Sequence, residues 1–158
     1  MLEGGEDARF IARRMIVLAS EDIGNADPQA LQVAVAAAAA VEHVGLPEAQ
    51  FALSQAAIYL SMAPKSNAAK RAILDARAHV REHGAVDPPG PLRSSAFPLA
   101  SKALGRGQGY DNPHNHPGHV NTQEHLPEGR EELRLYRPDE AEGELQDRLQ
   151  RIREQRER

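Results

Sequence analysis

Histidine side chains gather in one stretch of this sequence, and their spacing comes nearest to that of a chemical site. The stretch holds His114, His116, His119, Glu124 and His125. Imidazoles two and three residues apart can converge on zinc, and a carboxylate could complete a set of four ligands. However, the spacing is not the helical H-E-x-x-H pattern, and no predicted helix or strand fixes the geometry. We therefore interpret these as loop histidines and predict no bound metal, with a metal-dependent hydrolase as the remote alternative.

Two other patterns resemble nucleotide-binding motifs but lack the residues those motifs need. Lys65 and Ser66 precede a predicted helix, but Pro64 stands where a phosphate-binding loop has glycines that free its backbone amides. The alternating glycines of residues 105–109 follow no predicted strand, as a dinucleotide-binding turn would. No Ser-His-Asp set or carboxylate pair stands out, and the chain contains no cysteine. The sequence therefore predicts no catalytic residues and no cofactor in this chain.

The composition predicts an all-α protein with the length of one domain. Aromatic residues make up 4% of the 158 residues and tryptophan is absent, which disfavours an aromatic-rich β-sandwich or barrel. The formal net charge of −4 gives no general argument for a nucleic-acid partner. No apolar run is long enough to span a membrane, and no signal segment is evident. We expect a cytoplasmic protein without a membrane partner.

Residues 1–84 are predicted to form a four-helix core, because apolar residues recur at helical spacing between clear start and stop signals. The predicted helices begin near residue 6, after Asp27, near residue 48 and after Ser66. Gly45 suits the left-handed turn that ends the second helix. Short connections make these helices capable of antiparallel packing.

The remaining chain divides into two further parts. Residues 85–138 are predicted as an irregular segment rich in Pro, Gly and His, packed on the core in the same domain, with one short helix from Pro98 to Leu104. Residues 139–158 are predicted as a charged helical tail whose acids precede its arginines, as the helix dipole favours. We interpret the tail as a solvated helix lying on the core.

The second and third predicted helices are apolar or small around almost their whole circumference, so they should be buried on more than one side. Eighty-four residues cannot bury two such helices fully. Either the later segment covers them or another copy of the chain does, and both alternatives stay open on the residues alone. The candidate interface residues are Leu31, Val35, Ala36, Ala37, Phe51 and Ile58.

Basic residues cluster around the fourth predicted helix, which makes DNA binding the second functional hypothesis. Arginines and lysines at helical spacing could meet phosphates, whereas a solvated charged face is the simpler interpretation. The candidate DNA-contact residues are Lys65, Lys70, Arg71, Arg77 and Arg81.

Several short stretches, in unbroken order, resemble one protein family. They are LEGGED (2–7), IARR (11–14), ASEDIG (19–24), ADP (26–28), APKSNA (63–68), GQGY (107–110), QEHLP (123–127) and YRP (136–138). Together they resemble the C-terminal part of the replication-associated recombination protein A (RarA, or MgsA) family, relatives of the Werner helicase-interacting protein. These are AAA+ ATPases of the clamp-loader type. The resemblance runs from Met1 to about Pro138, and the tail after Pro138 is unmatched.

This resemblance implies an all-α unit, related to the clamp-loader collar, that assembles family members into a homotetramer. It implies that ATP and magnesium belong to an upstream module, so that this chain looks like a fragment or a truncated gene product. DNA and replication-fork proteins, such as the single-stranded-DNA-binding protein, would be partners of the full-length, nucleoid-associated protein. At His116, His119 and His125 the family allows Tyr, Phe or Gly, so a metal site would be peculiar to this sequence.

Overall fold

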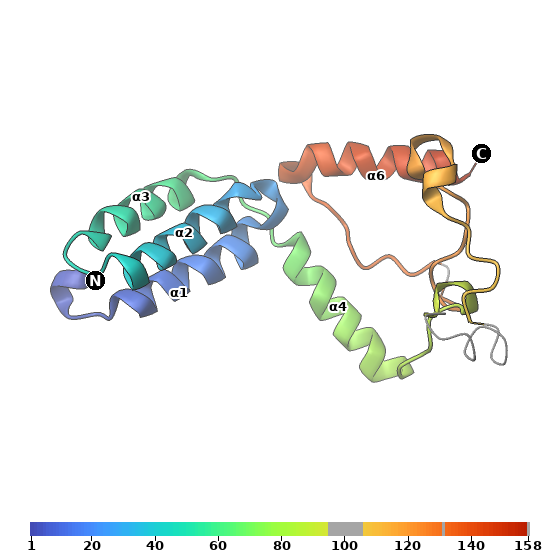
Figure 1. Ribbon diagram of the computed structural model, residues 1–158, viewed down its shortest axis with the longest axis horizontal. Coiled ribbons are helices and arrows are strands. Elements are labelled where there is room, and N and C mark those ends of the chain that lie inside the picture. The colour runs from blue at the N-terminus through green and yellow to red at the C-terminus, as the bar shows by residue number, and fades with distance from the viewer. Residues whose placement is uncertain (95–105, 131, 158) are drawn as a thin grey trace. The chain divides into compact units, whose positions relative to one another are not determined.

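The computed structural model describes residues 1–94, 106–130 and 132–157, and all regular structure in these ranges is helical (Figure 1). The prediction of an all-α protein is confirmed. The chain divides into two units. Unit 1 comprises Met1–Ala76 with Leu135–Gln146, and unit 2 comprises Arg77–Arg134 with Asp147–Arg158. The predicted boundaries at residues 84 and 138 stay a prediction, and the predicted helix from Pro98 to Leu104 lies outside the described residues.

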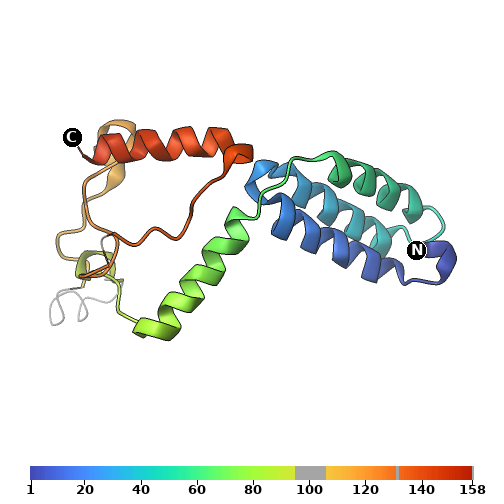
Figure 2. The same cartoon turned by 180° about the vertical axis from the view of Figure 1, so that it is seen from behind.

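Unit 1 is built on three helices that lie side by side in both views (Figures 1 and 2). They are α1 (Ala8–Leu18), α2 (Gln29–His43) and α3 (Ala49–Met62). The Asp7 carboxylate accepts a 2.7 Å hydrogen bond from the Arg9 amide, and Asp27 accepts one of 3.1 Å from the Gln29 amide. Carboxylates at these positions satisfy amides that have no partner within the helix. Gly45, with φ of +77°, follows α2 in the left-handed conformation.

Alanine side chains dominate the core of unit 1. On α2, Ala30, Ala34 and Ala37 are each no more than 3% exposed, and they pack in clusters that also contain Leu53 and Leu60 of α3. Because an alanine side chain is a single methyl group, the helix backbones can approach closely. A core built in this way has room for few large side chains, and several large apolar side chains of α2 and α3 are exposed instead.

Two further helices begin in unit 1. Helix α4 (Ala68–His83) begins in unit 1, and α6 (Gly143–Arg156) is preceded by the 3-10 turn η7 (Glu140–Glu142). Asp139 caps this turn by accepting a 3.2 Å hydrogen bond from the Ala141 amide. Ser66 caps α4 by accepting a 3.2 Å bond from the Ala68 amide, as the sequence predicts.

Unit 2 contains the remaining residues of α4 and α6, together with short 3-10 turns. The turns are η4 (Gly90–Leu92), η5 (Pro113–Asn115) and η6 (Pro117–His119). A side-chain bond orders the loop: the Asn121 amide, 5% exposed, donates a 2.7 Å hydrogen bond to the Asp111 carbonyl oxygen. None of the helices in the described ranges is long and apolar enough to cross a membrane.

Candidate interaction surfaces

Helix α3 carries apolar side chains on two opposite faces. Its inner face is formed by Ala49, Leu53, Ala56 and Leu60, all at most 3% exposed. Its outer face is formed by Phe51, Ile58 and Met62, which are 69%, 57% and 74% exposed. At 3.6 residues per turn the second set projects away from the first. We call Phe51, Ile58 and Met62 the outer α3 face.

Helix α2 presents a second exposed apolar position beside α1. Val35, 49% exposed, lines a groove of about 320 Å³ that Ile16 and Ala12 of α1 line from the other side. Leu31, four residues earlier, is 40% exposed. Ala36 is exposed on the other flank of the helix, whereas Ala37 is buried in the unit 1 core. The six residues predicted for the interface therefore divide among the outer α3 face, both flanks of α2 and the core.

Three of the five predicted DNA-contact residues take part in contacts within unit 1. Lys65 donates hydrogen bonds to the carbonyl oxygens of Leu60 and Ala63, near the end of α3. Lys70 forms an ion pair with Glu21. This hydrogen bond and charge lower the pKa of the Glu21 carboxyl and raise the pKa of Lys70.

Arg71 donates to the Asn67 side chain and lies 3.9 Å from the Asp139 carboxylate. The other two predicted residues, Arg77 and Arg81, lie in unit 2 and are exposed. Within the part of the chain that the structure describes, neither has a hydrogen bond or an ion pair from its side chain. DNA contact by these five residues stays a prediction.

Three of the loop histidines make side-chain contacts, but not with one common partner. The His116 Nε2 atom lies 2.7 Å from the Asp111 carboxylate, and the His114 and His119 rings meet edge to face with centroids 4.9 Å apart. The backbone amides of Leu126 and His125 donate hydrogen bonds to the Glu124 carboxylate, and these bonds lower the pKa of Glu124. Across residues 1–94, 106–130 and 132–157, no three His, Asp or Glu side chains are placed to hold a metal ion.

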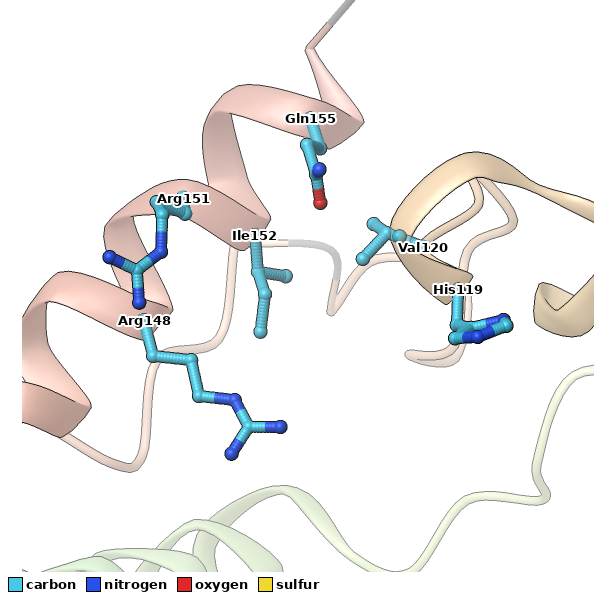
Figure 3. Close-up of a pocket in the computed structure, with 7 residues that line it drawn as sticks. His119, Val120, Arg148, Arg151, Ile152 and Gln155 are labelled. Atoms are coloured by element: carbon cyan, nitrogen blue, oxygen red, sulfur yellow. The ribbon is translucent and has the colours of Figure 1, made fainter.

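A hollow of about 600 Å³ lies in unit 2 between α6 and the turn η6 (Figure 3). Arg148, Arg151, Ile152 and Gln155 line it from the helix, and Gly118, His119 and Val120 line it from the turn. The sequence does not predict this site, although the arginines at positions 148 and 151 share one helix face. Nothing in the sequence indicates which loop would lie against them.

These features define a class of protein: a helical domain with small-residue helix packing and exposed apolar faces. The family model described as "MgsA AAA+ ATPase C terminal" matches residues 1–153, and the chain belongs to this family. The predicted family is confirmed. The match also includes most of α6, so the expectation that the tail after Pro138 is unmatched is wrong.

Individual relatives agree with this assignment. A AAA domain-containing protein of Mycobacterium tuberculosis is 46% identical over 155 residues, which are 97% of this chain and 34% of the relative. Replication-associated recombination protein A of Haemophilus influenzae is 39% identical over 98% of this chain and 35% of the relative. ATPase WRNIP1 of Dictyostelium discoideum is 40% identical over 81% of this chain and 15% of the relative. The chain thus spans about a third or less of these relatives' lengths.

Proposed function

We propose that this chain is the assembly domain of a AAA+ ATPase, and that it forms a homotetramer through apolar surfaces on α2 and α3. The outer α3 face is the observation that supports this proposal most directly. Phe51, Ile58 and Met62 are more than half exposed on a helix whose other face is already buried. Large apolar side chains aligned on one face of a helix are typical of protein interfaces.

Burial of this face would favour association. Removing a large apolar side chain from water contributes about 1.5–3 kcal/mol. Three such side chains on each copy offer a gain comparable to the loss of translational and rotational freedom on association. A second copy is the natural occupant, because a two-fold axis brings the same apolar face of two chains together.

A tetramer with dihedral symmetry needs two different isologous interfaces. The groove beside Val35, together with Leu31, is a second exposed apolar surface and shares no residue with the outer α3 face. We assign one interface to each surface. Ala36, on the other flank of α2, would lie at the edge of one of them.

The assembly would serve a larger protein. The matched region makes up 35% of one relative, which is named replication-associated recombination protein A, and 15% of another, which is named ATPase WRNIP1. We propose that ATP and magnesium bind in the rest of such a protein, and that four copies of this domain hold four ATPase modules together. DNA, and fork proteins such as the single-stranded-DNA-binding protein, would then be partners of the whole assembly at the nucleoid.

Sedimentation equilibrium of a Phe51→Glu/Ile58→Glu variant tests the proposal. Two carboxylates on the outer α3 face should lower the association state while leaving the helical content unchanged, because both positions are exposed in the single chain. Thr122→Glu/Gln146→Glu is the matched control, since it adds the same charge at exposed positions that belong to neither α2 nor α3. A wild-type mass for the Phe51→Glu/Ile58→Glu variant would refute assembly through α3.

A further inference from the structure

The hollow in unit 2 is lined by cations on one wall and by a ring and apolar groups on the other. Figure 3 shows Arg148, Ile152 and Gln155 projecting from α6 toward the segment that carries His119 and Val120. Its volume, about 600 Å³, is enough for one or two nucleotide-sized groups. A duplex, with its much larger diameter, would not enter it.

The two walls are held together by contacts that involve neither Arg148 nor Arg151. The Arg156 guanidinium donates a 2.9 Å hydrogen bond to the Gln123 carbonyl oxygen and lies 3.8 Å from the Glu124 carboxylate. Gln155 packs so closely on Gly118 that a Cβ at residue 118 would lie 3.0 Å from its Nε2 atom. The turn is therefore fixed against α6 without the help of Arg148 or Arg151.

Arg148 and Arg151 lie on the same helix face, because residues three apart are neighbours on a helix. Within the described residues, neither side chain has a hydrogen bond or an ion pair. The nearest acids along α6 are Glu144, Asp147 and Glu154, and the last of these accepts a 2.9 Å hydrogen bond from Gln150. Two exposed guanidinium groups that form no ion pair among the described residues favour an anionic ligand with more than one charge.

The opposite wall carries an imidazole ring, that of His119. His119 has a left-handed backbone, with φ of +57°, and its ring packs against the ring of His114. Val120 supplies apolar surface on the same wall, and Ile152 supplies apolar surface from α6. Aromatic rings beside a cationic groove are typical of sites for unpaired nucleic-acid bases.

We propose that this hollow binds single-stranded nucleic acid, with Arg148 and Arg151 on successive phosphates and the His119 ring against a base. The inference does not depend on tetramer formation, since every lining residue belongs to unit 2 of one chain. It also differs from the DNA hypothesis for residues 65–81, three of which are already paired within unit 1.

Fluorescence anisotropy of the wild-type chain with a labelled oligothymidylate tests this proposal. At low salt, Arg148→Gln/Arg151→Gln should weaken binding at least tenfold. It should also reduce the slope of log affinity against log salt by about 1.4, because a single strand contributes about 0.7 for each phosphate neutralised. His119→Ala should weaken binding roughly fivefold without changing the slope, because stacking releases no counterions.

Two controls make the result decisive. Arg153→Gln removes one cation from the same helix outside the hollow, and Arg77→Gln/Arg81→Gln removes two cations from the other candidate surface. Both should bind like the wild type, and unchanged melting temperatures would show that all variants are folded. The proposal is overturned if the wild type does not bind, if Arg148→Gln/Arg151→Gln binds normally, or if Arg77→Gln/Arg81→Gln loses as much affinity. It is also overturned if inorganic phosphate displaces the oligonucleotide at equal phosphate concentration.

Discussion

The Ser66 hydroxyl donates a 2.8 Å hydrogen bond to the Asp139 carboxylate, joining residues 73 positions apart. Ser66 is 3% exposed and caps the start of α4, and Asp139 caps the turn before α6. Glu142 completes the arrangement, because its carboxylate accepts a 3.2 Å bond from the Asp139 amide. This pair therefore links the beginnings of two helices inside unit 1.

Replacing Asp139 should destabilise unit 1. Asp139→Ala removes a helix cap and leaves the buried Ser66 hydroxyl without its acceptor, at a cost of about 1–3 kcal/mol. Urea unfolding monitored by circular dichroism would show this as a lower midpoint. Asp139→Asn separates the two effects, because its amide oxygen can still accept from the Ala141 amide while an NH2 group replaces the oxygen that accepts from Ser66, so its midpoint should lie between those of Asp139→Ala and the wild type. Equal midpoints for Asp139→Ala and the wild type would contradict the role of this pair.

Gly24 is a position where unit 1 leaves no room for a side chain. Its φ is +54°, and a Cβ there would lie 3.0 Å from the backbone carbonyl oxygen of Ser66. Gly24→Ala should therefore cost at least about 1 kcal/mol, because the backbone is strained and the neighbouring atom cannot move freely. Gly4→Ala, where the added methyl group meets open space, should melt like the wild type. Equal melting temperatures for the two variants would show that the close approach at Gly24 does not affect the stability of the fold.

Neighbouring alanines on α2 can separate folding from assembly. Ala37 is 3% exposed in the core, so Ala37→Glu buries an unpaired carboxylate and should destabilise the fold by several kcal/mol. Ala36 is exposed, so Ala36→Glu should leave the helical content intact while weakening association. Melting curves and sizing of both variants would measure the two effects. Similar melting temperatures for both would show that this part of α2 packs differently.

The Glu21–Lys70 ion pair should make stability depend on pH in a defined direction. Because Lys70 lowers the pKa of Glu21, the stabilisation is present above the ordinary value of 4.5 and is lost as pH falls through the lowered pKa. It is also lost in strong base, as pH rises through the raised pKa of Lys70. Carbon-detected NMR titration should give a lower Glu21 pKa in the wild type than in Lys70→Gln. Identical titration curves would show that the pair does not form.

The sequence predicts the local features of unit 1 well, because short-range signals control them. Asp27, Ser66 and Gly45 lie at helix ends as their chemistry dictates. The excess apolar character of the second and third helices also predicts that large side chains such as Phe51 are left over after the core is formed. These expectations depend on residues within a few positions of one another.

Long-range pairings could not be predicted in the same way. Nothing near Lys70 in the sequence indicates that Glu21 neutralises it, and nothing near Asp139 indicates Ser66. The hollow beside Arg148 likewise depends on a loop held there by Arg156. Each of these contacts joins segments more than 30 residues apart, where periodicity and capping signals carry no information.

The molar mass of the wild-type chain in solution tests the central proposal most directly. One chain has a mass of 17.2 kDa, so a homotetramer should give four times 17.2 kDa, or about 69 kDa, by multi-angle light scattering. We predict this mass across a concentration series from the low micromolar range upward. A constant mass near that of one chain, up to several hundred micromolar, would contradict assembly through the apolar surfaces of α2 and α3.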